Sequence, residues 1–229
     1  TAVGYDALSS NYGGSNTALG RGAGSSITSG ANNIMIGYAA GSDTVLMTDG
    51  AQNICIGNYS RTGASGSDYQ IVMGYAVTGN ADDSFCFGKN ATDSAIAYGA
   101  TSITAPSDIR LKEDIQDEEV GLDFINELRP VTFLWKKEKD VPKEMVAHGE
   151  GSEERVMNGK HNHGFIAQEV KEVIDKYDLK EGFDMWTEDE TDGRQRIGEG
   201  ALIPMLVKSI QELSAEVEQL KQKNNNNGE

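Results

Sequence analysis

The sequence is poor in cysteine, proline and aromatic residues, and it contains no long apolar run. Two cysteines, four prolines and 7 % aromatic residues occur among 229 residues. Cys55 and Cys86 lie within apolar triplets, and no cysteines or histidines have metal-ligand spacing. We therefore expect buried free thiols, no metal and no cofactor. No apolar run is long enough to span a bilayer, and no basic-then-apolar signal pattern opens the chain.

Positive charge is scarce as well. The 20 basic residues are outnumbered by 36 acidic residues, which gives a formal net charge of −16. Polyanions repel such a chain, so neither a nucleic-acid backbone nor an anionic membrane is an expected partner. The chain begins at Thr1 inside a repeat, and we expect it to be part of a longer protein.

The composition changes sharply near residue 106. Residues 1–106 hold 17 of the 27 glycines, no glutamate, three basic residues and seven aspartates. Their net charge is 3 − 7 = −4, which leaves −12 for residues 107–229. This shift predicts two domains, 1–106 and 107–229.

The first half is a degenerate repeat of a polar residue, a short apolar strand and a glycine. The units lie at 1–4, 16–20, 33–37, 53–57, 70–74, 84–88 and, more loosely, 95–99. Their glycines recur at intervals of 16, 17, 20, 17, 14 and 11 residues. Such periodicity predicts stacked strand-and-turn units in which each glycine takes a turn with positive φ.

Strands this short give a single stack only a thin core, which several chains wrapped together would enlarge. The pattern resembles the head repeats of trimeric autotransporter adhesins and the shafts of phage fibres, both three-chain β structures. It favours a trimeric β-solenoid or interleaved β-prism, with a monomeric β-helix as the alternative. We expect a rigid rod or knob, whose longer loops at 44–49 and 62–68 are candidates for binding a host-surface receptor. The close glycines at 20–24 indicate no dinucleotide site, because no βαβ pattern surrounds them.

The second half reads as an α+β domain. Apolar periodicity predicts helices at 118–128 and 165–177. Residues 131–135 are typical of a strand, and 136–162 are expected to be a hairpin or an exposed loop. Residues 184–196 are expected to form a loop and strand pair.

A terminal helix over about 203–223 completes the domain. Its apolar residues alternate at spacings of three and four, as in a coiled-coil seam. The seam comprises Ile203, Leu206, Ile210, Leu213, Val217 and Leu220. Ile or Val at one seam position with Leu at the other favours two strands in isolated coils, and we expect the attached domain to impose three. The alternative is a single amphipathic helix packed on its own domain.

One spacing suggests bond-breaking chemistry. Ser107 and Lys112 are five residues apart, with Asp108 and Arg110 between them. A lysine made neutral by dehydration can take the proton of a serine and activate it as a nucleophile. By local pattern alone, a serine after Pro106 and before charged residues is more typical of a helix N-cap.

The motifs of this half follow one another in a recognisable order. The run at 107–112 is followed by 128–136, by His163-Gly164-Phe165-Ile166-Ala167-Gln168-Glu169-Val170, and by the terminal helix. This order resembles the intramolecular chaperone auto-processing domain at the C-terminus of phage tail spikes, tail fibres and endosialidases, with a related domain in myelin regulatory factor. The resemblance covers about residues 105–223.

The resemblance implies a homotrimer located in the virion tail, whose C-terminal domain chaperones assembly and then removes itself into the host cytoplasm. Ser107 would be the nucleophile and Lys112 the base, dehydrated when the trimer closes. The auxiliary candidates are Asp108, Arg110, His163, Gln168 and Glu169. His163 could polarise the scissile carbonyl or orient the serine, whereas His148 and His161 are expected to be solvated loop histidines.

Ring size distinguishes the two bonds beside the serine. Attack of the Ser107 hydroxyl on the Pro106 carbonyl closes a five-membered ring, whereas attack on its own carbonyl closes a strained four-membered ring. We therefore expect the cut at Pro106–Ser107, with Ser107–Asp108 as the second choice. The alternative function is a non-catalytic trimeric fibre tip, in which the C-terminal domain stays attached as a structural cap or receptor-binding module.

Overall fold

The computed structural model describes residues 1–179 and 181–226. The chain divides into two compact units, Thr1–Asp114 and Ile115–Glu229. The composition boundary at 106/107 lies a few residues before this division, within the last part of the first unit. It stays a prediction based on sequence.

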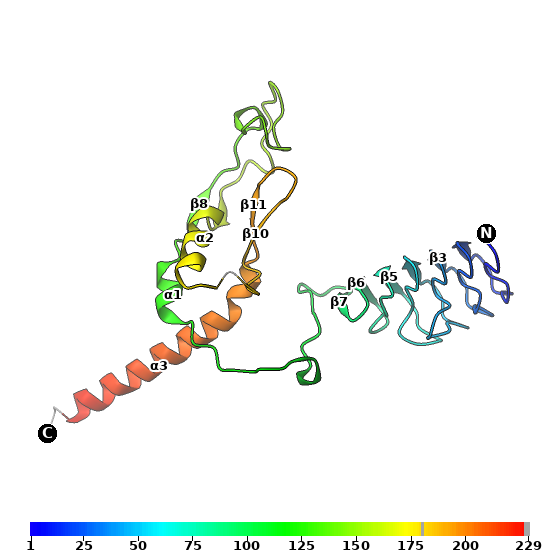
Figure 1. Cartoon of the computed structure of the whole chain (residues 1–229), viewed down its shortest axis with the longest axis horizontal. Helices are drawn as coiled ribbons and strands as arrows, with labels where there is room; N and C mark the ends of the chain where they lie inside the picture. The colour runs from blue at the N-terminus through cyan, green and yellow to red at the C-terminus, as the bar shows by residue number, and fades with distance from the viewer. Residues whose placement is uncertain (180, 227–229) are drawn as a thin grey trace. The chain divides into compact units, whose positions relative to one another are not determined.

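The first unit is a β-solenoid (Figure 1). Six strands pair in parallel in sequence order, each in register with the next. They are β1 (Ala2–Val3), β2 (Thr17–Leu19), β3 (Ile34–Ile36), β4 (Ile54–Ile56), β5 (Gln70–Tyr75) and β6 (Ser84–Lys89). Each predicted repeat unit up to residue 88 supplies one of these strands, so the prediction of stacked strand-and-turn units is confirmed.

The prediction that residues 95–99 form a further turn of the solenoid is wrong. β7 (Thr92–Ala97) runs antiparallel to β6 and pairs Ser84 with Ala97 and Lys89 with Thr92. The physical reason is length. Only 11 residues separate the last two glycines, fewer than any complete turn uses, and the chain folds back in a hairpin instead.

Strand alternation builds the core of the solenoid. The central residues Ala18, Met35, Cys55, Val72 and Cys86 are partners in register and are at most 1 % exposed. Successive side chains of a strand point to opposite faces, so these residues point inward and stack from turn to turn. Both cysteines are free and buried, as predicted.

The polar residue that opens each repeat forms a buried ladder. The Asn33 backbone N–H donates to Asn16 Oδ1 at 2.9 Å, and the Asn53 N–H donates to Asn33 Oδ1 at 2.9 Å. Gln70 continues the ladder, because its N–H donates to Asn53 Oδ1 at 2.9 Å. The Asn33 amide also donates to the Gly50 carbonyl at 2.8 Å. Each amide thus satisfies backbone groups of adjacent turns that would otherwise be buried without partners.

The glycine that closes each repeat sits where two turns touch. At Gly37, φ is +127°, and an added Cβ would lie 2.7 Å from the carbonyl carbon and oxygen of Gly57. Both the backbone conformation and the close approach therefore require glycine there.

The second unit contains three α-helices and two short hairpin sheets among its described residues. The helices are α1 (Leu122–Glu127), α2 (Ala167–Lys176) and α3 (Ile203–Asn226). The strands are β8 (Val131–Phe133), β9 (Asn162–Gly164), β10 (Trp186–Glu188) and β11 (Gln195–Ile197), and the pairs β8–β9 and β10–β11 are antiparallel. Two 3₁₀ turns, η2 (Glu138–Asp140) and η3 (Glu199–Leu202), complete the unit.

The helices pack around Phe124, which is fully buried. The Phe124 ring meets the Tyr177 and Phe183 rings edge-on, with centroids 5.4 and 6.1 Å apart. Val170 and Ile174 of α2 and Met205 of α3 complete the same buried cluster. The predicted helices are confirmed, although α1 is shorter than expected and begins at Leu122. Residues 136–161 are largely irregular, as expected, apart from η2 and an isolated bridge between Lys137 and Arg155.

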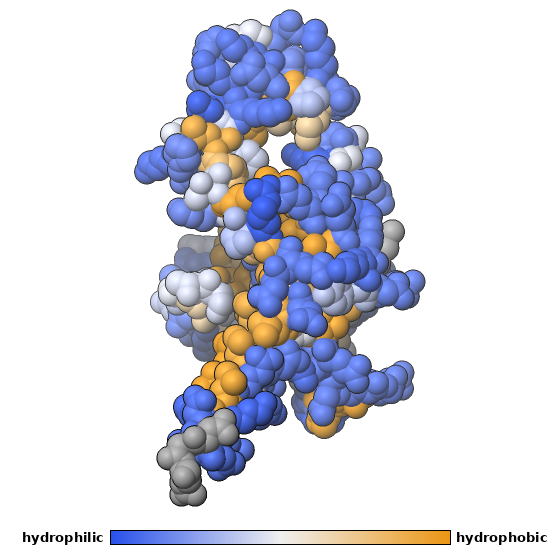
Figure 2. All heavy atoms as spheres, turned by 90° about the vertical axis from the view of Figure 1, so that its left-hand side faces the viewer, coloured by the Kyte–Doolittle hydropathy of each residue, from blue (hydrophilic) through white to orange (hydrophobic). Residues whose placement is uncertain are grey.

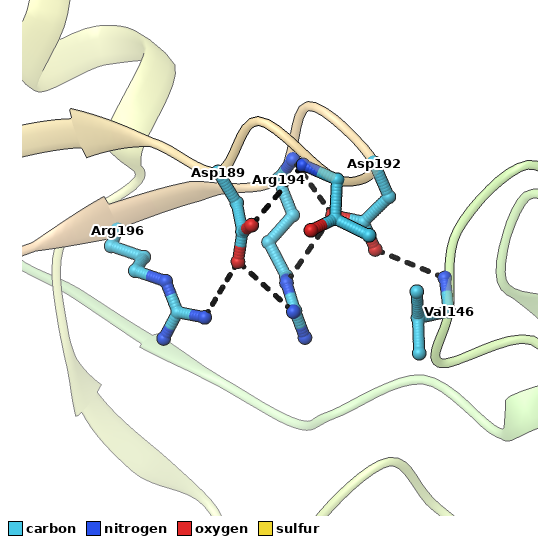
Figure 3. Close-up of polar contacts among 6 residues, drawn as sticks. Val146, Asp189, Asp192, Arg194 and Arg196 are labelled. Atoms are coloured by element: carbon cyan, nitrogen blue, oxygen red, sulfur yellow. Dashed lines mark hydrogen bonds and ion pairs between the residues drawn. The ribbon is translucent and has the colours of Figure 1, made fainter.

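A charged cluster clips the β10–β11 hairpin to the irregular segment (Figure 3). Asp189 Oδ2 accepts hydrogen bonds from Arg194 at 3.0 Å and from Arg196 at 2.7 Å. Asp192 Oδ2 accepts from the backbone N–H of Val146 at 3.0 Å. The hydrogen bond from Arg196 holds the pKa of Asp189 well below its usual range. The two carboxylates therefore tie the hairpin tip to itself and to the segment around Val146.

No helix within residues 1–179 and 181–226 combines the length and the apolar character that a membrane span requires.

Candidate functional site

The Ser107 segment lies outside both hydrophobic cores. Every residue from 97 to 119 is exposed, and the last buried residue of the first core is Ala95. Within this stretch Thr104 pairs with Ala95 in an isolated antiparallel bridge, and a 3₁₀ turn, η1 (Ile109–Leu111), follows. Short-range hydrogen bonds therefore position the side chains of this segment.

Asp108 forms the cap of the turn. Its Oδ1 accepts the backbone N–H of Arg110 at 2.9 Å, and its carbonyl accepts the N–H of Leu111 at 3.0 Å. The alternative in which Ser107 is the N-cap is therefore wrong for this turn. An aspartate one position later makes the capping hydrogen bond, which leaves the serine hydroxyl for another partner.

That partner is Lys112. The Lys112 Nζ donates to Ser107 Oγ at 2.8 Å, in the same range as a strong side-chain hydrogen bond. The turn makes this contact possible, because it folds the backbone back between the two residues. A nucleophile and a basic group within hydrogen-bond reach are the minimum geometry for proton transfer between them.

Asp108 and Arg110 lock the turn that carries the pair. The two carboxylate oxygens of Asp108 accept from the Arg110 guanidinium at 3.0 and 2.6 Å. This hydrogen bond lowers the pKa of Asp108 and raises the pKa of Arg110. The ion pair thus favours the charged forms of both residues and adds contacts within the turn.

The Ser107–Lys112 pair is exposed to solvent in a single chain. Ser107 and Lys112 are exposed, and the neighbouring apolar side chains of Ile109 and Leu111 are 73 % and 67 % exposed. Large aliphatic side chains held in water are typical of a surface that becomes covered by a partner. Water therefore reaches the Lys112 amine in the single chain.

The remaining auxiliary candidates belong to the second unit. His163 lies in β9, where it is paired in register with Thr132, and Gln168 is exposed in the first turn of α2. Glu169 accepts a hydrogen bond from Arg129 Nε at 2.9 Å, which lowers the pKa of Glu169. Glu169 therefore has a structural partner. Catalytic roles for His163 and Gln168 stay predictions. Among the described residues, no cluster of three His, Cys, Asp or Glu side chains could hold a metal ion.

The predicted seam on α3 is an exposed apolar stripe. Its six side chains are between 42 % and 63 % exposed, although most are leucine or isoleucine. Hydrophobic side chains follow α3 toward its C-terminal end in Figure 2. A different face of the helix packs on its own unit, because Met205 and Ser209 are buried there. The seam side chains therefore stay exposed although another face of α3 packs on the same unit.

The solenoid carries a second exposed apolar surface. Strand residues that flank the buried ones point outward and form ladders of large side chains from turn to turn. Leu19, Ile34 and Met73 are 50 %, 37 % and 40 % exposed, and Phe85 and Phe87 continue the two ladders. Such a face on a solvated rod is also typical of an interface.

The aromatic residues of the first unit were missed as a group by sequence reasoning. Tyr5, Tyr38 and Tyr75 each follow the glycine of a repeat, and Arg21 takes the same position after Gly20 in the second repeat. The edge-on contacts of Tyr59 with Tyr38 and Tyr75 have centroid distances of 5.1 and 5.9 Å. The signal was available, since repeat positions one turn apart must lie side by side in a solenoid.

Comparison with known proteins identifies one part of the chain. Residues 107–179 match the model of a family named as a peptidase and described as "chaperone of endosialidase". No curated protein and no solved structure matches the chain. The matched region begins at Ser107 and runs through α1, β8, β9 and α2. Residues 107–179 are therefore similar to the chaperone of endosialidase family, which supports an intramolecular chaperone domain of phage tail proteins in this part of the chain.

Proposed function

We propose that this chain is the C-terminal part of a phage tail spike or fibre whose chaperone domain drives trimer assembly and then releases itself by a single self-cleavage. The observation that carries this proposal is the 2.8 Å hydrogen bond between Lys112 Nζ and Ser107 Oγ at the first residues of the family match. The family is named as a peptidase, which supports a cleaving role for a serine at this place.

The proposed reaction begins with proton transfer from the Ser107 hydroxyl to the neutral Lys112 amine. Ser107 Oγ then attacks the carbonyl carbon of Pro106, and the bond from that carbon to the Ser107 nitrogen breaks. The nitrogen takes the proton from Lys112, which leaves an ester between Pro106 and Ser107. Water hydrolyses this ester to a Pro106 carboxylate and a free Ser107 hydroxyl. Intramolecular positioning of this kind can lower the activation barrier by about 7–11 kcal/mol. That is enough for a reaction that each chain carries out only once.

Assembly supplies the switch in this scheme. A charged amine donates a hydrogen bond to Ser107 Oγ, and only a neutral amine can accept the hydroxyl proton. Covering Ile109 and Leu111 with a neighbouring copy would remove water from Lys112 and favour its neutral form. Cleavage would then follow assembly and not precede it.

Two exposed apolar surfaces support the homotrimer. The α3 seam and the outer ladders of the solenoid both hold large aliphatic or aromatic side chains in water. Pairing of β surfaces from separate chains is slow, because closure entropy is lost before the contacts form. Association of the α3 helices would raise the local concentration of the solenoids and register them.

The first test compares wild type with Ser107→Ala and Lys112→Ala on a denaturing gel. We expect wild type to yield fragments of 106 and 123 residues (229 − 106), while both variants remain at 229 residues. Intact-mass measurement of the fragments distinguishes a cut before Ser107 from a cut after it. Ser102→Ala, an exposed serine in the same stretch, is the matched control and should cleave normally. An uncut wild-type trimer would favour the non-catalytic fibre tip instead.

A second test separates assembly from chemistry. Leu213→Asp places a charge in the exposed seam, whereas Gln211→Asp places it on another face of α3. We expect Leu213→Asp to be monomeric by light scattering and uncut, and Gln211→Asp to be trimeric and cut. A monomeric Leu213→Asp chain that still cleaves at the wild-type rate would refute the coupling.

A further inference from the structure

The last strand of the solenoid carries, on its free edge, a residue that lies just before the candidate cut. β7 pairs on one side with β6, at the end of the stack away from the N-terminus (Figure 1). On its other side Ala95 meets Thr104 in the isolated antiparallel bridge. The Ala95 N–H donates to the Thr104 carbonyl at 2.8 Å, and the Thr104 N–H donates to the Ala95 carbonyl at 2.7 Å. Pro106, whose carbonyl is the proposed acyl group, follows two residues later.

The Thr104 side chain adds a third hydrogen bond to this bridge. Its Oγ1 donates to the Ala95 carbonyl at 3.0 Å, so that carbonyl accepts from both the backbone and the side chain of Thr104. Ala95 is 5 % exposed and is paired in register with the buried Cys86 of β6. The bridge therefore fastens an exposed segment of the chain to a residue of the solenoid core.

The two residues after Thr104 form a stiff connection. The proline ring fixes φ at Pro106, and a following proline restricts Ala105 to extended conformations. Residues 105–107 separate the bridge from Asp108, which caps the turn that carries the serine–lysine pair. The Pro106 carbonyl therefore lies between two points that hydrogen bonds fix, and few free torsions connect it to either point.

We propose that Thr104 is a positioning residue for self-cleavage, which anchors the acyl side of the Pro106–Ser107 bond to the folded end of the solenoid. This role rests on the proposed function and deepens it. Attack of a hydroxyl on a carbonyl carbon depends steeply on alignment, and a misplacement of about 1 Å can slow a reaction about 100-fold. The hydrogen bonds of Thr104 go to Ala95, so Thr104 acts through the position of the Pro106 carbonyl and not on the proton transfer itself.

The test measures the first-order rate of cleavage of the full chain, pulse-labelled during cell-free synthesis and followed on denaturing gels. Chain concentrations are raised until the rate no longer depends on them, so that assembly does not limit it. We expect Thr104→Val to cleave about fivefold more slowly, because one hydrogen bond is lost. Thr104→Pro also removes the backbone donor and should cleave at least about tenfold more slowly.

Two further variants test whether the hydroxyl carries the effect. Thr104→Ser keeps a hydroxyl donor at the same position, and we expect it to cleave at the wild-type rate. Thr101→Val is the matched control, because Thr101 is an exposed threonine three residues earlier that lies outside the bridge. It should also cleave at the wild-type rate.

The pH dependence of the rate separates positioning from other effects. The midpoint of the pH–rate profile reports the protonation of the general base, whereas the plateau reports the rate of the correctly protonated pair. We expect the Val and Pro variants at Thr104 to lower the plateau and to leave the midpoint at the wild-type value. Labelling of Cys86 with a disulfide reagent, measured in parallel, reports whether the end of the solenoid is still folded.

A wild-type cleavage rate in Thr104→Pro would overturn the positioning role, and so would a shifted midpoint with an unchanged plateau. If Thr104→Pro opens the end of the solenoid and Cys86 reacts fast, the comparison of Thr104→Val with Thr104→Ser decides, and equal rates of these two refute the anchor. An uncut wild type refutes the proposed function, and the anchor with it. A wild type that is cut while no Thr104 variant is slowed refutes the anchor alone, so the two failures are distinguishable.

Discussion

The carboxylate of Glu212 on α3 accepts a hydrogen bond from the backbone N–H of Leu122, the first residue of α1, with 2.8 Å between Oε2 and N. The two residues are 90 positions apart in the chain. A helix leaves its first N–H groups without internal partners, and here a side chain of a second helix satisfies one of them. Gly121 makes room for this contact, since a Cβ there would lie 2.4 Å from Glu212 Oε2.

This cap predicts a coupled effect of two substitutions. We expect Glu212→Ala to destabilise the second unit by about 1 kcal/mol, the usual contribution of an N-cap. Gly121→Ala should destabilise by a similar amount, because it displaces the same carboxylate, and the double variant should be less than additive. Urea unfolding followed by tryptophan fluorescence measures this, since Trp135 and Trp186 both lie in the second unit. Glu216→Ala, exposed on α3, is the control, and full additivity would refute the shared contact.

The asparagine ladder predicts a large effect of a small side-chain change in the first unit. Asn33→Leu removes the acceptor of the Asn53 N–H and the donor to the Gly50 carbonyl inside a buried site. Each unsatisfied buried group costs about 1–3 kcal/mol, so we expect the solenoid to unfold at much lower urea concentration. Reaction of the buried thiols with a disulfide reagent reports this opening, because Cys55 and Cys86 both lie in the first unit.

The control for this experiment is Ser29→Ala, an exposed position in a neighbouring loop. Wild type and this control should react slowly, because burial raises the pKa of the Cys55 thiol to about 12 and leaves little thiolate at neutral pH. Fast labelling of the folded wild-type chain would contradict the buried-core assignment.

The close approach of turns predicts intolerance of side chains at the repeat glycine. Gly37→Ala combines an unfavourable φ with a contact to the Gly57 backbone, and we expect a loss of about 1–3 kcal/mol from the conformation alone. Gly14→Ala is the matched control, because nothing lies within 4 Å of an added Cβ there and its φ is not positive. Thiol labelling again compares the two, and equal protection would show that the solenoid does not need glycine at its corner.

Acidification should weaken one contact of the second unit within a defined range. Hydrogen bonds from Lys137 and Lys139 lower the pKa of Glu153 from 4.5 to about 2. A carboxyl group whose pKa is depressed in the folded state stabilises it above its ordinary value and loses that contribution as pH falls toward the folded value. We therefore expect Glu153→Gln to be less stable than wild type at neutral pH and equal to it near pH 2.

The gap between wild type and Glu153→Gln should close between pH 4.5 and about 2, as read from urea midpoints by tryptophan fluorescence. Glu144→Gln, an exposed glutamate of the same segment, should track wild type throughout. A gap that is independent of pH would mean that the two lysines do not act through the carboxylate charge.

Much of the solenoid could be predicted from sequence because each of its turns is a local signal. A polar residue, a strand of alternating burial and a glycine recur from Asn16 to Gly88, and all of them have local causes. The failure at β7 has a different origin. A loose match to the apolar pattern was taken as a turn, although the shorter interval before Gly99 permits only a hairpin.

The candidate site was visible from sequence only as a spacing. Serine and lysine five positions apart could belong to any capped turn, and the local pattern did not indicate that Asp108 would be the cap in place of Ser107. The Glu212 contact could not be predicted from sequence, because the residues that meet there are separated by most of a domain. The trimer, the cut and the auxiliary roles of His163 and Gln168 stay predictions for the experiments above.

The exposed stretch from 97 to 119 separates two hydrophobic clusters that share no residue. Opening the backbone beside Ser107 would divide the chain between these two clusters and leave the residues of each cluster on one product. We therefore expect cleavage to leave the packing within each hydrophobic cluster unchanged. What changes is topology, since the chaperone part would no longer be tied to the rod it had helped to assemble.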